Sequence, residues 1–144
     1  MSKFEEQFCE ILGSNEIEYV RNDRSMFGTP DFTFYGGRIV LFLHGCFWHG
    51  HNCKNWQLDG AWCSKISCTI EKDIKVRQYY LREKIRFLRV WECEFNWNKK
   101  NTANKIITEI ERAQFHSYIP KKHQSVRLCS SRNIDMNLQK NLSF

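Results

Sequence analysis

The sequence lacks several features that would place the protein in a membrane or outside the cell. The 144-residue chain has no apolar run as long as the roughly 18 residues that a membrane-spanning helix needs. The longest apolar stretch, Ile39 to Leu43, has the length of a strand. The start, Met1-Ser2-Lys3-Phe4-Glu5-Glu6, does not resemble a secretory signal peptide. We therefore expect a cytoplasmic protein with no membrane partner.

The chain also lacks internal repeats and low-complexity segments, and its seven cysteines are an odd number. Without a secretory signal, these cysteines are better explained as reduced thiols and metal ligands than as a disulfide framework. The length suits one domain with a hydrophobic core. The net charge of +6 favours a polyanionic partner such as nucleic acid.

The apolar pattern predicts helices over residues 3–12, 69–84 and 102–115. It predicts strands over 31–35, 38–44 and 87–91, and Gly36-Gly37 predicts a hairpin between the first two. Residues 45–68 are predicted to be irregular, and Ile70, Ile74 and Leu81 to form the apolar face of the second helix. This order indicates an α/β domain over residues 1–116, with a small mixed central sheet flanked by helices. The polar, basic segment 117–144 is predicted to be a flexible tail.

Residues 44–53 read His-Gly-Cys-Phe-Trp-His-Gly-His-Asn-Cys, a density of histidine and cysteine that favours a metal site. Cys46, His51 and Cys53 supply three ligands, whereas a structural zinc ion normally has four. Cys93, just after the last predicted strand, is the best fourth candidate, although it could be a simple buried thiol. Two other cysteines compete for this place, Cys63 and Cys68.

A second group of residues favours cation-assisted chemistry. Asp31 opens one predicted strand and His44 ends the next, so both side chains can lie at one edge of the sheet. Magnesium prefers oxygen ligands, and phosphodiester cleavage needs a cation together with a base that activates water. Histidine is the side chain that most often serves as such a base, and His49 is the candidate here. Taken alone, Asp31 is as well explained as a turn or cap residue.

Three segments carry a family resemblance: Gly28-Thr29-Pro30-Asp31-Phe32, the run from Leu43 to Cys53, and Trp91-Glu92-Cys93. Together they resemble the very-short-patch-repair (Vsr) endonucleases over about two thirds of the chain, from Glu5 to Cys93. The resemblance implies a restriction-endonuclease-like fold and a magnesium-dependent nick in double-stranded DNA. In that family the nick lies 5′ of the thymine in a T:G mismatch, the product of 5-methylcytosine deamination.

The resemblance also implies roles for six residues of the active site. Asp31 matches the metal-binding aspartate, and Leu43 would add its backbone carbonyl as a second magnesium ligand. His49 matches the histidine that activates water. The other matches are a second histidine, a glutamate that orients active-site groups, and a further acidic residue: His44, Glu5 and Asp73.

Matches outside the catalytic centre concern zinc and DNA. The resemblance gives the same four structural zinc ligands that the spacing favours: Cys46, His51, Cys53 and Cys93. Phe47, Trp48 and Trp62 match aromatic residues that wedge into the base stack beside the mismatch. Wedging unstacks and kinks DNA. Because a mismatched base step costs less free energy to open than a paired one, this deformation would favour binding at the mismatch. Without the resemblance, Phe47 and Trp48 could form a small local core over the zinc loop, and Trp62 could be a core residue.

The chain departs from the family pattern in ways that concern DNA recognition more than chemistry. Leu43 stands where the best-known pattern has threonine, and few residues precede Glu5, where the family has an arm that reaches DNA. The loop between Cys53 and Trp62 is short, and the segment after Cys93 is long and basic. One alternative is therefore a site-specific nuclease of homing or restriction type that acts on paired DNA. Another is a non-catalytic zinc module that binds DNA. We expect a monomer, with mismatch-repair proteins as possible partners.

Overall fold

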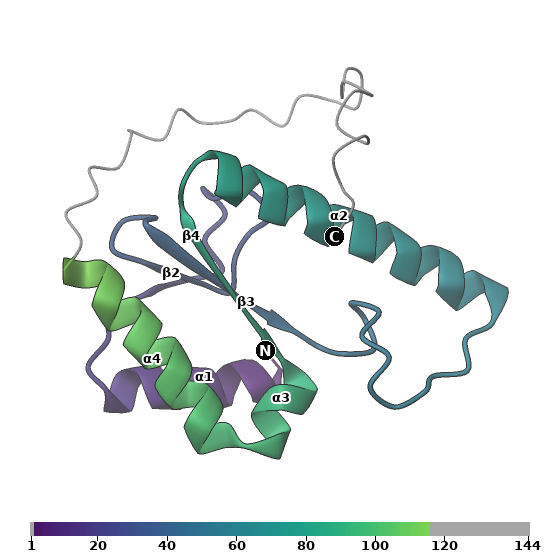
Figure 1. The fold of residues 1–144 in the computed structure, drawn as a ribbon, viewed down its shortest axis with the longest axis horizontal. Coiled ribbons are helices and arrows are strands. Elements are labelled where there is room, and N and C mark those ends of the chain that lie inside the picture. Colours follow the sequence, from purple (N-terminus) through teal and green to yellow (C-terminus); the bar gives the residue numbers. More distant parts are fainter. Residues whose placement is uncertain (1, 116–144) are drawn as a thin grey trace.

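The computed structural model describes residues 2–115, so the basic segment 117–144 lies outside the described residues. Within these residues the chain forms a four-stranded sheet and four helices (Figure 1). Their bounds are α1 (Lys3–Ser14), β1 (Val20–Arg21), β2 (Phe32–Phe34), β3 (Ile39–His44), α2 (Gly60–Arg82), β4 (Arg86–Trp91), α3 (Glu92–Trp97) and α4 (Lys99–Phe115). None of the helices among residues 2–115 is long and apolar enough to cross a membrane.

The sheet is mixed, which confirms the predicted α/β class. Its strand order is β1-β2-β3-β4, with antiparallel pairs β1/β2 and β2/β3 and a parallel pair β3/β4. The predicted hairpin joins β2 to β3, where Gly36 and Gly37 both have positive φ, at 65° and 92°. Parallel neighbours need a long crossover connection, and here α2 and its flanking loops supply it.

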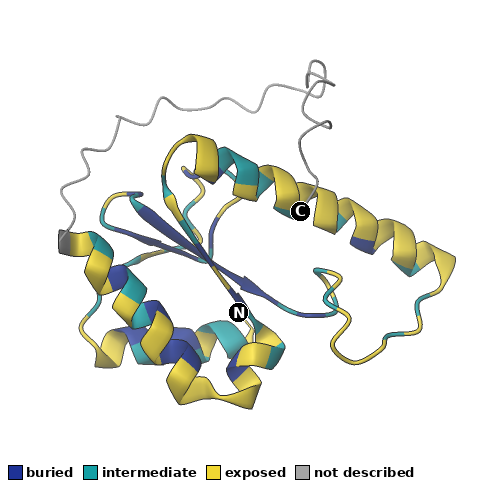
Figure 2. Ribbon diagram, in the orientation of Figure 1, coloured by how far each residue is buried: buried dark blue, intermediate teal, exposed yellow. Residues whose placement is uncertain are grey.

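Helices cover both faces of the sheet (Figure 1). Alternate residues of β3 separate the two sides because successive side chains point to opposite faces. Leu41 and Leu43 join the larger core, with Phe8 of α1 and Phe95 of α3. Val40 and Phe42 join a smaller core under α2, and His44 continues that alternation toward α2. All of β3 is buried (Figure 2).

Helix α2 begins at Gly60, so the prediction of irregular structure up to residue 68 was wrong for its last nine residues. Asp59 caps the helix, because its side chain accepts a hydrogen bond from the Trp62 N–H at 3.0 Å. The residues after this cap lack a long apolar stripe, so periodicity alone missed the first turns. Trp62 therefore lies on a helix and not in a loop.

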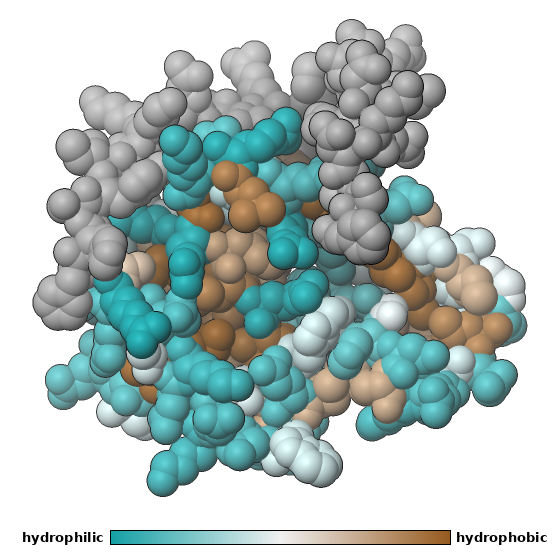
Figure 3. Space-filling view, in the orientation of Figure 1, coloured by the Kyte–Doolittle hydropathy of each residue, from teal (hydrophilic) through white to brown (hydrophobic). Residues whose placement is uncertain are grey.

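The predicted apolar face of α2 was also wrong. Ile70, Ile74 and Leu81 are 38%, 47% and 61% exposed, whereas Ile66 and Tyr80 are the buried residues of this helix. Figure 3 shows hydrophobic side chains at the surface along α2. The helix packs on the sheet through a different set of residues near its C-terminal end: Val76, Tyr79 and Tyr80.

The last two helices both differ from the sequence prediction. Helix α3 was not predicted, and it begins directly after β4, so Cys93 lies in its first turn. Helix α4 begins at Lys99, before the predicted residue 102, because the Asn98 side chain accepts a hydrogen bond from the Asn101 N–H at 3.0 Å.

Candidate active site and metal cluster

A cavity of about 440 Å³ opens between the C-terminal end of β3 and helix α2. Its walls carry five of the six residues that the sequence assigned to the active site: Asp31, Leu43, His44, His49 and Asp73. Two lysines from α2 also lie at its walls, Lys72 and Lys75. Glu5 comes from α1 and is outside this lining.

The turn before Asp31 is attached closely to α2. A Cβ on Gly28 would lie 2.6 Å from a methyl carbon of Val76, and the φ of Gly28 is +77°, so this approach requires glycine. The Tyr80 hydroxyl donates a hydrogen bond to the Phe27 carbonyl at 2.6 Å. These contacts hold the turn, and with it Asp31, against the helix that carries Asp73.

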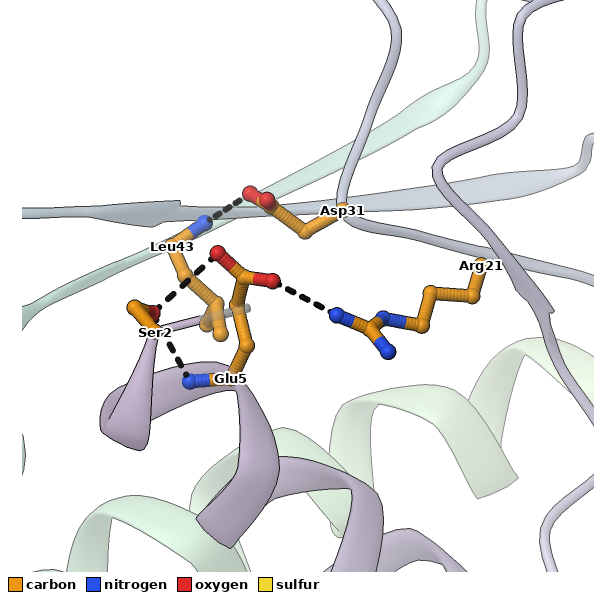
Figure 4. Close-up of polar contacts among 5 residues, drawn as sticks. All are labelled: Ser2, Glu5, Arg21, Asp31 and Leu43. Carbon is orange, nitrogen blue, oxygen red and sulfur yellow. Dashed lines mark hydrogen bonds and ion pairs between the residues drawn. The ribbon is translucent and has the colours of Figure 1, made fainter.

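Asp31 and Leu43 bring two kinds of oxygen to the same place. The Asp31 carboxylate accepts a hydrogen bond from the Leu43 N–H at 2.6 Å (Figure 4). The N–H and C=O of one strand residue face the same neighbour, so the Leu43 carbonyl also faces the β2 side. Continuing the β2–β3 register by two residues places Pro30 opposite Leu43, and proline has no N–H to donate. A carboxylate and a backbone carbonyl that receives no hydrogen bond from Pro30 suit a hard cation such as magnesium.

Burial is the main cause that raises the pKa of Asp31 from 3.8 to about 6. The negative charge of Glu5 raises it further, while the Leu43 N–H and the charge of His49 lower it. A carboxylate that is costly to ionise in a polar cavity is typical of a functional site.

Two histidines and Asp73 form a compact group beside Asp31. The Nδ1 atom of His49 lies 2.6 Å from the Asp73 carboxylate, and the Nδ1 of His44 lies 3.9 Å from the same oxygen. The two imidazole rings stack, with centroids 3.8 Å apart and planes 7° apart. A hydrogen bond from Nδ1–H to Asp73 leaves the Nε2 of His49 as the proton acceptor of the neutral ring.

The two histidines differ in burial. His44 is 3% exposed, and burial lowers its pKa to about 3, with the charges of His49 and Arg89 adding to the effect. His44 is therefore a neutral ring at physiological pH. His49 is more exposed and makes the shorter contact with Asp73.

The predicted metal ligands Cys46, His51, Cys53 and Cys93 lie together, with their ligand atoms within 4.8 Å of one another. The Nδ1 of His51 is 3.5 Å from the Cys46 sulfur and 3.4 Å from the Cys93 sulfur. A tetrahedral ion with zinc-like bond lengths would separate nitrogen and sulfur ligands by about 3.6 Å. The donor set and its spacing therefore fit one tetrahedral metal ion.

The pKa of Cys46 and the positions of Cys63 and Cys68 are both consistent with a metal ion at these four residues. Burial raises the pKa of Cys46 to about 12, so its thiolate needs a cation beside it. Among the described residues, this cluster includes neither Cys63 nor Cys68, which are exposed on α2.

Trp91 connects the metal cluster to the histidine pair, and sequence reasoning did not assign it a role. Its ring stacks on His51, with centroids 4.5 Å apart, and meets His44 edge-on at 5.2 Å. The guanidinium of Arg89 lies 4.7 Å from the centre of the same ring. The motif Trp91-Glu92-Cys93 could have indicated a role for this tryptophan, but Trp91 contributed only to the family resemblance.

The predicted wedge residues form an aromatic cluster with a fourth member that the sequence analysis missed. The ring of Phe47 lies 5.2 Å from Trp48, 5.4 Å from Trp62 and 5.3 Å from Trp56. Trp48 is 59% exposed. Lys65 lies 4.9 Å from the Trp62 ring centre. The cluster thus presents an aromatic, cationic surface beside the metal loop.

Several known proteins are similar to this chain in sequence. A family model described as DNA mismatch endonuclease Vsr matches residues 2–55. The DNA mismatch endonuclease Vsr of Escherichia coli K12 is 30% identical over 111 residues, which cover 74% of this chain and 71% of that protein. This chain belongs to the Vsr family. The Vsr resemblance seen in the sequence is confirmed.

Other relatives of this Vsr-family chain carry the name type II nicking enzyme. V.NmeAIP from Neisseria meningitidis serogroup A is 33% identical over 104 residues, 67% of this chain and 74% of that enzyme. V.XorIIP from Xanthomonas oryzae is 41% identical over 90 residues, 60% of this chain and 66% of that enzyme. The protein is accordingly a DNA endonuclease, and DNA is its partner.

Proposed function

We propose that this Vsr-family endonuclease nicks one strand of DNA 5′ of the thymine in a T:G mismatch, with magnesium, in very short patch repair. The observation that carries the proposal is the meeting of Asp31, the Leu43 backbone, His49 and Asp73 at one cavity. The name of the Escherichia coli relative supports the mismatch as target. We also propose that the mixed sheet and its helices are a restriction-endonuclease-like core.

His49 is the proposed general base. Its Nε2 takes a proton from the attacking water, and Asp73, 2.6 Å from Nδ1, stabilises the imidazolium that forms. The stacked ring of His44 stays neutral, since its pKa is about 3, and so does not repel that charge at 3.8 Å. His44 thereby fixes the plane of His49 without opposing its protonation.

Asp31 and the carbonyl of Leu43 are the residues that would hold magnesium, and their oxygen chemistry fits that ion. When bound, the cation neutralises charge on the phosphate and on the leaving oxygen. Leucine supplies the backbone carbonyl as well as threonine would, so the departure at residue 43 is compatible with this role. The lysines at the cavity wall, Lys72 and Lys75, provide positive charge for the phosphate backbone.

Zinc is the proposed occupant of the four-residue cluster of Cys46, His51, Cys53 and Cys93. Four protein ligands close the coordination shell, which is typical of a structural site. The ion would join the loop after β3 to the first turn of α3. Because His49 lies within that loop, the ion would also hold the base in place.

The aromatic cluster is the proposed DNA wedge. Opening a base step costs a few kcal/mol, and a mismatched step costs less because it pairs and stacks poorly. Exposed Trp48 is the ring best placed to enter the stack, with Phe47 and Trp62 supporting it. Because one active site makes one nick, we propose that the enzyme acts as a monomer, with mismatch-repair proteins as partners.

A second candidate function is site-specific nicking of paired DNA. The relatives named type II nicking enzymes favour it. The chemistry would be the same, and only the feature recognised in the DNA would differ.

Two labelled duplexes that differ by a single T:G mismatch test both candidates. The zinc-loaded protein is incubated with each duplex, with and without Mg2+, beside Asp31→Ala and His49→Ala, with Cys63→Ser as a matched control. The proposal expects a Mg2+-dependent nick at the mismatched thymine only, retained in Cys63→Ser and lost in the other two variants. Equal nicking of both duplexes supports site-specific cleavage. Tight DNA binding without any Mg2+-dependent nick would refute both and indicate a non-catalytic zinc module.

A further inference from the structure

The carboxylate of Glu5 is held at both of its oxygens (Figure 4). Arg21 donates a hydrogen bond to Oε2 at 2.8 Å, and the Ser2 hydroxyl donates one to Oε1 at 3.1 Å. The side chains of Arg21 and Glu5 are 30% and 23% exposed, so the ion pair is partly shielded from solvent. A carboxylate has about four acceptor sites, which leaves two for other donors.

The sheet register directs Arg21 toward α1. Arg21 pairs with Phe32, and the Phe32 side chain lies in the larger core together with Phe8 of α1. Val20, one residue earlier, has the opposite orientation because side chains alternate along a strand. The Asn22 N–H donates to the Asp31 carbonyl at 3.0 Å, so the strand that carries Arg21 is attached to the residue that carries the catalytic carboxylate.

Glu5 acts on Asp31 across this edge of the sheet. Figure 4 shows the Glu5 side chain rising from the first turn of α1 toward Asp31 and Leu43. The charge of Glu5 is felt at Asp31, where it adds to the effect of burial. Two carboxylates converging on one point need a positive partner, and the Arg21 guanidinium is the one in contact with Glu5.

Ser2 and Glu5 alone have a simpler explanation. The spacing Ser2-x-x-Glu5 is that of a capping box, and the Ser2 hydroxyl does accept a hydrogen bond from the Glu5 N–H at 3.2 Å. A capping box does not require Arg21. The ion pair that reaches from β1, sixteen residues away, is therefore the feature that capping leaves unexplained.

We propose that Arg21 is a positioning residue that holds Glu5 toward the cation site at Asp31. With a cation bound at Asp31, the remaining lone pairs of Glu5 would be available to accept hydrogen bonds from the water that the cation holds. This inference rests on the proposed function, since it deepens the magnesium site of that function. Residues that orient a metal site from its second layer change metal affinity by about 10- to 100-fold when they are replaced.

The positioning role and a plain charge effect predict opposite results. Arg21 carries a positive charge near the cation site, so removing that charge alone should tighten cation binding. Removing an orienting partner should weaken it, because Glu5 then loses its fixed direction. The sign of the change in affinity therefore separates the two explanations.

The test measures Mn2+ binding to the zinc-loaded protein by electron paramagnetic resonance of free Mn2+, without DNA. We expect Arg21→Met to weaken binding by about tenfold or more, and Arg21→Lys to recover part of it. In a Glu5→Gln background, Arg21→Met should add little further loss, because the two residues act together. Arg24→Met, which removes an exposed arginine outside this ion pair, should leave Mn2+ affinity near that of the wild type. Zinc content and the unfolding temperature confirm that each variant is folded.

Unchanged or tighter Mn2+ binding in folded Arg21→Met overturns the inference. An Asp31→Ala arm separates this failure from a failure of the proposed function. If Asp31→Ala loses Mn2+ binding and Arg21→Met does not, only the inference about Arg21 fails. If Asp31→Ala binds Mn2+ as the wild type does, the magnesium site is misplaced, and both fail.

Discussion

Replacing Asp31 by asparagine is expected to stabilise the folded protein while it abolishes the nick. Burial raises the pKa of Asp31 from 3.8 to about 6, so its ionisation is more costly in the folded chain than in the unfolded one. The rise of this pKa from 3.8 to about 6 corresponds to about 3 kcal/mol. Below pH 3.8 both states hold the proton and there is no penalty. The penalty grows as the pH rises toward 6 and is constant above it.

Asparagine keeps an oxygen that can accept the Leu43 N–H but has no charge to bury. The gain in the free energy of unfolding should therefore be about 3 kcal/mol at pH 7.5 and about half of that at pH 5. Urea unfolding of both proteins at the two pH values, in matched zinc-containing buffer without Mg2+, measures this difference. The metal cluster is the same in both proteins, so its own pH dependence cancels.

Two results would refute this reasoning about Asp31. One is an asparagine variant that is no more stable than the wild type at pH 7.5. The other is a stability difference that does not change between pH 5 and pH 7.5, which would assign the effect to packing and not to ionisation. A separate expectation concerns the cation. Adding Mg2+ at ten times its dissociation constant should stabilise the wild type by about 1.4 kcal/mol and leave the asparagine variant unchanged.

Three further changes test the base, the metal cluster and the wedge. Asp73→Asn should lower the single-turnover nicking rate by about 10²- to 10⁴-fold, because His49 loses the carboxylate that stabilises its protonated ring; a rate within a few fold of the wild type would contradict the dyad. Cys53→Ser should remove bound zinc, measured by elemental analysis, and lower the unfolding temperature, whereas Cys63→Ser should do neither. Trp56→Ala should weaken binding to mismatched DNA by about 1 to 3 kcal/mol, measured by titration, because its ring packs on Phe47 in the aromatic cluster. Equal affinity would show that Trp56 only supports the loop.

Short-range patterns accounted for much of this molecule. The hairpin at Gly36-Gly37, the buried strand at residues 39–44 and the mixed sheet follow from turn chemistry and apolar periodicity. Three of the four metal-cluster residues lie within eight positions of the chain, so the geometry of the loop after β3 alone brings them close. The family motif belongs to this same local kind of information.

Contacts between distant elements depended on register and packing. His49 meets Asp73 only because α2 crosses the end of β3, and nothing in the local pattern marks Asp73 among the acids of that helix. The same holds for the aromatic cluster, where the cap at Asp59 starts α2 early and carries Trp62 to Phe47.

By itself, the sequence determined the chemistry of the site, because residue types and their spacing along one loop and two strands specify which ligands and bases are available. Tertiary structure decided which of these groups act on one another. Side chains alternate along β1, so Arg21 and not Val20 points toward Glu5. The packing of α2 leaves Ile74 exposed and brings Asp73 to His49. Pair distances across a sheet edge arise from strand register and helix position, and those depend on the whole packed core.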